Sequence, residues 1–162
     1  MVRSSEHRGR GRRRLASTLV IAAAVVALDQ VTKSIALAHL HQPVHLVGPF
    51  GLNLTLNSGA AFSLFTGSTG AIVVVAVAVI ALLGWVAWRS RTIGLSIGLG
   101  LILGGALGNL SDRLFRGHRG AVVDFITLTH WPTFNVADSS ITIGAILVVV
   151  FSLRRPRAAA AA

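Results

Sequence analysis

The chain contains no cysteine, which excludes disulfide bonds, thiol catalysis and cysteine-ligated metals. Aromatic residues make up only 6% of it and do not alternate with basic residues, so the net charge of +10 does not indicate a nucleic-acid partner. Acidic residues are also scarce, with five among 162 residues. A carboxylate near a bilayer is costly, so a chain that is 53% hydrophobic should keep acids mainly where it uses them.

The long apolar stretches predict membrane helices. A membrane-spanning helix needs ~20 predominantly apolar residues, and four stretches meet that length, at about 15–38, 70–88, 93–110 and 136–153. All four prolines fall outside them, as helix energetics favours. The third stretch carries Gly100, Gly104 and Gly108 on one helical face, which predicts close packing against a neighbouring helix.

The basic residues predict the orientation. Eleven of the 15 Lys and Arg residues lie at 3–14, at 89 and 91, and at 154–157. Because cytoplasmic segments are enriched in such residues, we expect both termini and the 89–92 turn in the cytoplasm, with 39–69 and 111–135 on the outer face. Segments 1–14 and 154–162 are then cytoplasmic tails around a single domain at 15–153, and we expect the Arg-rich N-terminal tail and residues 158–162 to be disordered.

The N-terminus has a second interpretation. An Arg-rich start followed by an apolar run resembles a secretory signal peptide. Because no clear small-x-small cleavage site follows, we expect a retained first helix.

Residues 52–57 alternate apolar and polar side chains with period two, the pattern of a half-buried strand. The predicted fold class is therefore an all-α membrane protein, a four-transmembrane-helix bundle with a small β-sheet cradle on its outer face.

The first helix ends in a polar segment that contains Asp29 and Lys33. These residues are four apart, so they can pair on one helix face. Lys33 is the only lysine in the chain, and a Ser–Lys peptidase dyad with Ser58, Ser63 or Ser139 is therefore an alternative.

The third helix ends in a second polar segment. If the helix continues, Asn109, Asp112 and Arg113 share one face, and we expect Asp112 and Arg113 to form an ion pair that organises a site. The predicted orientation places Arg113, Arg116 and Arg119 on the outer face, although basic residues are enriched in cytoplasmic segments. These three arginines therefore require a local explanation.

Glu6 lies in the N-terminal tail, which leaves Asp124 and Asp138. Neither has a cationic residue within four positions along the chain. Asp124 lies in an apolar run, and Asp138 lies in the first turn of the fourth helix, where it could also act as an N-terminal cap. The predicted orientation puts both at the same membrane face. Two carboxylates that share one proton can activate water and protonate a leaving amine. These residues alone leave open an aspartyl hydrolase, a proton-coupled carrier and a structural bundle.

Five sequence blocks, taken together, resemble the lipoprotein signal peptidase (signal peptidase II) family. They occur in order across about residues 15–153, and five blocks in register are far more specific than any one of them. One departure is the 115–121 segment, which is long and basic for the link between two blocks. The blocks are Asp29 to Lys33, Asn57 to Ser63, Gly104 to Arg113, Val122 to Phe125 and Phe134 to Ser139.

This resemblance implies an aspartic endopeptidase of the bacterial inner membrane that acts as a monomer in contact with membrane lipid. The substrate would be a prolipoprotein whose future N-terminal cysteine carries diacylglycerol, cut just before that cysteine. No metal or cofactor is implied, and His39, His41 and His45 are interpreted as an exposed loop. The implied catalytic pair is Asp124 and Asp138, with support from Asn57, Asn109, Asp112, Arg113, Asn135, Asp29 and Lys33.

Overall fold

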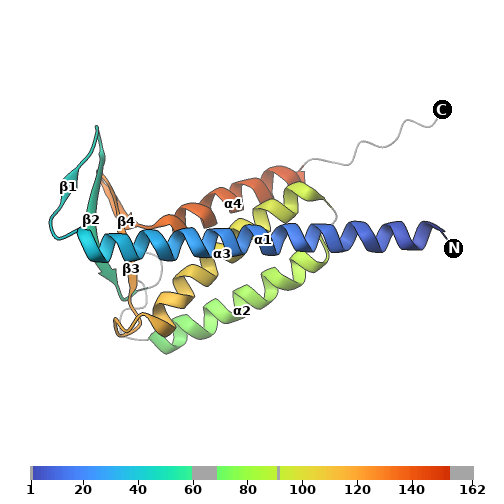
Figure 1. The fold of residues 1–162 in the computed structure, drawn as a ribbon, viewed down its shortest axis with the longest axis horizontal. Helices are drawn as coiled ribbons and strands as arrows, with labels where there is room; N and C mark the ends of the chain where they lie inside the picture. Colours follow the sequence, from blue (N-terminus) through green and yellow to red (C-terminus); the bar gives the residue numbers. More distant parts are fainter. Residues whose placement is uncertain (1, 60–68, 91, 154–162) are drawn as a thin grey trace.

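The computed structural model describes residues 2–59, 69–90 and 92–153. Within this part the helices lie side by side, and a small sheet covers one end of the bundle (Figure 1). This arrangement confirms the predicted fold class. The elements are α1 (Val2–His39), β1 (Val44–His45), β2 (Phe50–Asn57), α2 (Thr69–Trp88), α3 (Ile93–Phe115), β3 (Val122–Leu128), β4 (Trp131–Phe134) and α4 (Val136–Leu153).

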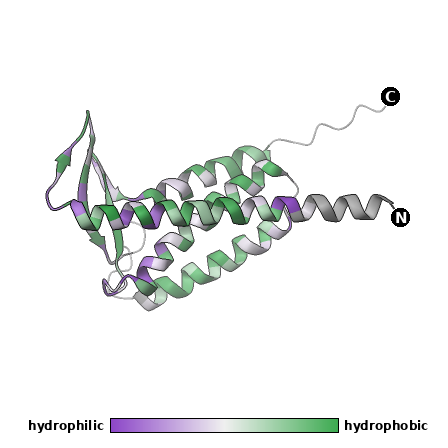
Figure 2. Ribbon diagram, in the orientation of Figure 1, coloured by the Kyte–Doolittle hydropathy of each residue, from purple (hydrophilic) through white to green (hydrophobic). Residues whose placement is uncertain are grey.

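Each of the four helices contains an apolar segment long enough to cross a membrane. These segments have mean hydropathies between 1.7 and 2.7. Hydrophobic residues dominate along the bundle, whereas hydrophilic ones gather near the sheet (Figure 2). Many large apolar side chains are exposed on the helices, as lipid-facing surfaces require. The segments are Arg13–His39, Gly70–Trp88, Ile93–Phe115 and Val136–Leu153.

The N-terminal segment differs from its expectation. The backbone of residues 2–14, expected to be disordered, is helical and forms the first part of α1. Arginine is a good helix former, and no proline precedes Pro43, so nothing in the sequence ends the helix earlier. The other expected tail, 154–162, lies outside the described residues.

Helix α3 is the centre of the bundle. Half of its apolar segment is buried, against 11–22% for the other three segments. Its glycines permit this close packing: Gly100, Gly104 and Gly108 face α1, as predicted, and a Cβ atom on Gly108 would lie 2.6 Å from Asp29 Oδ2. Gly105 meets the backbone of Ala137 at the start of α4 in the same way. These contacts bring three helices together at the sheet end.

The sheet is antiparallel with strand order β1-β2-β3-β4, and the predicted strand lies in β2. Its register contains one irregularity that matters for the site. Leu52 pairs with Ile126 but Thr55 pairs with Asp124, so β2 has one extra residue between these pairs. A bulge of this kind reverses which side chains face each side of the sheet. As a result, Thr55 and Asn57 share a face with Asp124, where Leu54 and Leu56 would otherwise lie.

Candidate active site

Asp124 and Asp138 line one cavity. The cavity has a volume of about 430 Å³ and lies where the sheet meets α3 and α4. Asn57, Asn109 and Arg113 also line it. Thus β3 supplies one carboxylate and the first turn of α4 supplies the other, although 13 residues lie between them in the sequence.

Asp124 is almost fully buried, with 2% of its surface exposed. Its Oδ2 accepts a hydrogen bond of 3.0 Å from Asn57 Nδ2, and its Oδ1 accepts one of 2.6 Å from Asn135 Nδ2. Burial raises the pKa of Asp124 to about 6, and the negative charge of Asp138 adds to the increase, against the lowering effect of the two amides. Asp124 is therefore suited to hold a proton at mildly acidic pH.

Asp138 forms a reciprocal cap at the start of α4, together with Asn135. Asp138 Oδ2 accepts from the backbone N–H of Asn135 at 3.2 Å, and Asn135 Oδ1 accepts from the backbone N–H of Asp138 at 2.9 Å. Asp138 therefore takes part in capping the helix, the alternative that the sequence left open for it, but from the first turn, with Asn135 at the N-cap position. The other oxygen, Oδ1, accepts from Asn109 Nδ2 at 2.9 Å, so the same carboxylate both caps the helix and faces the cavity.

Asn135 connects the two carboxylates. It is fully buried, and its Nδ2 donates to Asp124 Oδ1 and to Asn109 Oδ1 at 3.1 Å, while its Oδ1 accepts from the Asp138 backbone. Its side-chain amide thus contacts the Asp124 carboxylate and its backbone N–H contacts the Asp138 carboxylate, so one residue ties the orientations of the two carboxylates together.

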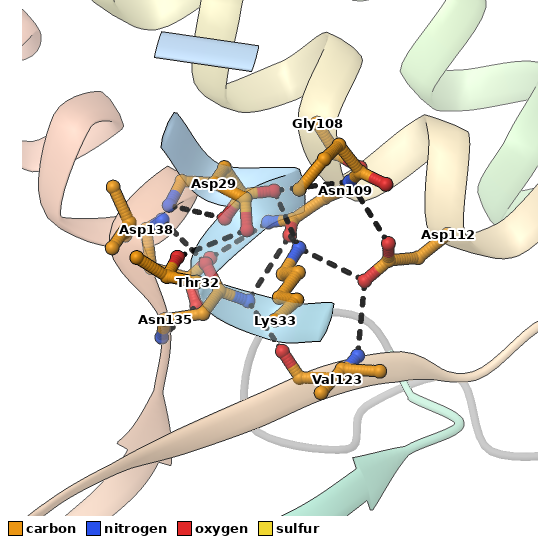
Figure 3. A network of polar contacts seen from close by, with 12 residues as sticks. Asp29, Thr32, Lys33, Gly108, Asn109, Asp112, Val123, Asn135 and Asp138 are labelled. Atoms are coloured by element: carbon orange, nitrogen blue, oxygen red, sulfur yellow. Dashed lines mark hydrogen bonds and ion pairs between the residues drawn. The ribbon is translucent and has the colours of Figure 1, made fainter. Parts of the chain in front are cut away.

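A buried ionic cluster lies behind the cavity, between α1 and α3 (Figure 3). Asp29, Lys33 and Asp112 are all 0% exposed. Lys33 Nζ lies 2.8 Å from Asp29 Oδ2 and 2.9 Å from Asp112 Oδ2, and it donates to Asn109 Oδ1 at 2.8 Å. The predicted Asp29–Lys33 pair is present, and it extends to a second carboxylate.

These contacts disfavour a Ser–Lys dyad. An ammonium has three N–H donors, and those of Lys33 are taken by two carboxylates and one amide. Ser139 donates to the backbone oxygen of Asn135, and Ser58 is exposed. Ser63, the third candidate, lies outside the described residues. Among the residues that are described, none of the contacts of the Lys33 ammonium is with a serine hydroxyl.

The cluster also binds the backbone on either side of the cavity. Asp29 Oδ1 accepts from the N–H of Ala137 at 2.9 Å, and Asp112 Oδ2 accepts from the N–H of Val123 at 3.1 Å. Ala137 directly precedes Asp138, and Val123 directly precedes Asp124. Each structural carboxylate therefore fixes the peptide group next to one cavity carboxylate.

The predicted ion pair between Asp112 and Arg113 is wrong. Arg113 donates to two backbone oxygens instead, at 2.8 Å to Gly120 and 2.7 Å to Gly59. The partner on α3 is Arg116, whose Nε lies 2.8 Å from Asp112 Oδ1. A spacing of four residues brings these two side chains together, whereas adjacent residues on a helix point apart.

Two residues of this region were not among the predicted site residues, Arg116 and Gln30. Gln30 Nε2 donates to Asp112 Oδ1 at 3.0 Å, and Gln30 Oε1 accepts from Arg116 at 2.7 Å. The i,i+4 spacing from Asp112 could have identified Arg116. Nothing local in the sequence indicates the partner of Gln30, which lies on another helix. The three histidines of the 39–45 segment are exposed, as expected, but only His41 lies in a loop, because His39 is the last residue of α1 and His45 lies in β1.

A family model and individual relatives of known name both match this chain. Residues 21–154 match the family model described as Signal peptidase (SPase) II. The chain is 46% identical over 147 residues to a lipoprotein signal peptidase of Mycobacterium avium (strain 104), covering 87% of this chain and 81% of that protein. It is 47% identical over 140 residues to the lipoprotein signal peptidase of Rhodococcus jostii (strain RHA1), covering 83% and 71%.

The fold has a solved counterpart. A bacterial membrane enzyme determined by the in meso method at 2.3 Å superposes with a TM-score of 0.76 at 30% identity, covering 85% of this chain and 88% of that one. The family match covers most of the chain, and the bundle, sheet and helix arrangement agree with it. The chain therefore belongs to the signal peptidase II family of aspartic peptidases.

Proposed function

We propose that this protein removes the signal peptide from prolipoproteins and that Asp124 and Asp138 form its catalytic pair. The observation that carries the proposal is that these two carboxylates line one cavity and are joined through two side-chain amides: Asn135 donates to Asp124 and to Asn109, and Asn109 donates to Asp138. Their different environments favour one shared proton, because burial and the neighbouring charge disfavour two ionised carboxylates.

In the proposed reaction, the ionised carboxylate takes a proton from a water molecule, and the water oxygen bonds to the scissile carbonyl carbon. The protonated carboxyl donates its proton toward the carbonyl oxygen, which gives a neutral tetrahedral intermediate. The nitrogen then takes the proton of the pair, and the carbon–nitrogen bond breaks to release an amine. As the carbonyl re-forms, one hydroxyl of the intermediate gives its proton back to the pair. One water molecule is consumed, and the pair returns to its singly protonated form.

The surrounding residues support this chemistry by fixing geometry. Asn57, Asn109 and Asn135 each donate a side-chain N–H to a carboxylate oxygen, which orients both members of the pair. Arg113 holds two backbone segments at the cavity wall, through Gly59 and Gly120. Such preorganisation matters because small misplacements of reacting groups greatly slow a reaction.

We further propose that the substrate is diacylglyceryl-modified and is cut just before the lipidated cysteine. The cavity lies at the end of the apolar bundle, where a lipid-anchored chain arriving from the bilayer would meet it. Apolar side chains of Trp131, Phe134 and Ile141 form part of its lining. We also propose that the enzyme acts as a monomer and that membrane lipid surrounds it, the latter because many large apolar side chains are exposed on its helices.

The substrate proposal predicts a strong preference in a cleavage assay. Purified protein in liposomes should cleave a diacylglyceryl-modified prolipoprotein at least about 100-fold faster, in kcat/KM, than the same prolipoprotein without the lipid, because the lipid's binding energy positions the bond. Mass spectrometry of the products should place the cut immediately before the modified cysteine. Equal rates on both substrates would contradict the lipid requirement, and no cleavage of either would contradict the proposed function.

The protein is a multi-pass bacterial membrane protein, and we propose that both termini are cytoplasmic and that the cavity opens at the outer face. The basic clusters at 3–14, 89–91 and 154–157 support this orientation. Because the chain has no cysteine, single-cysteine variants can report it. A membrane-impermeant maleimide added outside should label Asn53→Cys and leave Thr92→Cys unlabelled, both sites being exposed in the fold and outside the membrane spans. The reverse pattern would invert the topology.

A further inference from the structure

Arg116 lies in the basic 115–121 segment that departs from the family pattern, and it is not among the residues that line the cavity. It is the C-terminal cap residue of α3, with its backbone N–H bonded to the carbonyl of Asp112. Its side chain turns inward: only 15% of it is exposed, and its Nε lies 2.8 Å from Asp112 Oδ1. An arginine in a polar loop would instead be expected to extend into solvent.

The charges of the buried cluster balance only when Arg116 is included. Asp29 and Asp112 contribute two negative charges, whereas Lys33 contributes one positive charge. Arg116 supplies the second positive charge, through Asp112. Burying an uncompensated charge is strongly unfavourable, so Asp112 can remain ionised in its fully buried position only with such a partner.

Asp112 in turn holds the strand that carries Asp124. All of its hydrogen-bonding capacity is used: Oδ1 faces Gln30 and Arg116, and Oδ2 faces Lys33 and the backbone N–H of Val123 at 3.1 Å. If Arg116 is lost, Asp112 loses one of these contacts and half of its charge compensation. The Asp112–Val123 hydrogen bond, one residue from Asp124, then loosens.

We propose that Arg116 is a positioning residue for Asp124, acting through Asp112 and the Val123 backbone. This inference rests on the proposed role of Asp124 in peptide hydrolysis. It also accounts for one of the three arginines that stand against the orientation rule, because Arg116 serves a buried carboxylate and does not mark a cytoplasmic loop.

The shape of the guanidinium is part of this role. While Nε contacts Asp112, Nη2 donates to Gln30 Oε1 at 2.7 Å, and Gln30 itself donates to Asp112 Oδ1. A planar fork can make both contacts at once, whereas a lysine ammonium acts as a point charge. Lysine at this position should therefore restore the charge balance and only part of the geometry.

The test compares Arg116→Met, Arg116→Lys and the matched control Arg119→Met, which removes an exposed arginine three residues further along. Arg116→Met should lower kcat for prolipoprotein cleavage about 10- to 100-fold with KM within about twofold, because the catalytic group is displaced and substrate binding is not. Arg116→Lys should recover part of the loss. Arg119→Met should match wild type.

Amide hydrogen exchange supplies a readout that does not depend on activity. Exchange at the Val123 amide should be at least about tenfold faster in Arg116→Met than in wild type, and unchanged in Arg119→Met. The proposal is overturned if the Val123 amide is unaffected, if kcat per folded molecule is unchanged, or if the loss appears in KM alone. If wild type itself cleaves no prolipoprotein, the proposed function fails instead, and the exchange experiment still tests the Arg116 contact.

Discussion

Asp124→Asn and Asp138→Asn should each reduce prolipoprotein cleavage by about 10²- to 10⁴-fold, the range expected when a general acid or base is removed. Asparagine preserves the size of the side chain but can neither share a proton nor carry the negative charge. The measurement is product formation from a diacylglyceryl-modified prolipoprotein by purified, correctly inserted protein. Near wild-type cleavage by either variant would rule that residue out as a member of the pair.

Loss of folding should not explain this loss of activity. The pKa of Asp124 is raised to about 6 from an ordinary value of 3.8, so its ionised form destabilises the folded state by about 3 kcal/mol at neutral pH. Removing that charge therefore offsets the hydrogen bonds that the substitution disturbs. Thermal unfolding of Asp124→Asn should show no large decrease in Tm. Ser139→Ala, which changes a hydroxyl beside Asp138, is the matched control and should remain active.

The same shared proton makes the wild-type reaction depend on pH. As pH rises through about 6, Asp124 loses its proton and the singly protonated pair disappears, so kcat/KM should fall on the alkaline side. At low pH a second proton neutralises both carboxylates, and activity should fall again. The profile should therefore be bell-shaped, with values that belong to the pair and not to one residue. A rate that is flat from pH 5 to 8, roughly, would contradict the shared proton.

Lys33→Met should destabilise the protein by about 3–5 kcal/mol, the expected effect of breaking a buried ion pair by removing one partner. Asp29 and Asp112, both 0% exposed, would then face each other without the ammonium between them. Because these carboxylates also hold the Ala137 and Val123 backbones, activity should be lost together with stability. The measurements are thermal unfolding and cleavage activity per folded molecule.

A double variant distinguishes a role of Lys33 in balancing buried charges from a role in catalysis. Asp29→Asn combined with Lys33→Met leaves Asp112 and Arg116 as a balanced pair, so it should unfold at a higher temperature than Lys33→Met alone. A Ser–Lys mechanism predicts instead that Lys33→Met is stable and inactive, and that the double variant gains nothing. Arg119→Met is the matched control for loss of an exposed positive charge and should leave stability unchanged.

Patterns along the chain predicted the helices and the strand because their causes are local. Long apolar runs favour membrane helices, alternation at 52–57 favours a strand, and the spacing of Asp29 and Lys33 favours a pair on one helix face. The scarcity of acids also directed attention to Asp124 and Asp138. These features need no knowledge of which elements become neighbours.

The contacts around the cavity depend on the tertiary arrangement. The ion pair assigned to Arg113 belongs to Arg116, because helical direction and the position of α1 decide which guanidinium meets Asp112. Gln30 was not predicted because most of its partners, namely Gly108, Asp112 and Arg116, lie on α3 or at its C-terminal cap and are distant in sequence. Side-chain partners across elements cannot be inferred from spacing within one element.

By itself, the sequence determined the four apolar helices and the alternating strand at 52–57, because hydropathy and periodicity act over a few consecutive residues. It also drew attention to the five acidic residues. Only the tertiary structure decided which acids meet and what holds them. One extra residue in β2 turns Asn57 toward Asp124. The buried carboxylates of Asp112 and Asp29 accept hydrogen bonds from the backbone next to the two cavity aspartates. Both effects depend on strand register and on the packing of elements that are distant in sequence. Patterns within a few consecutive residues do not specify such contacts.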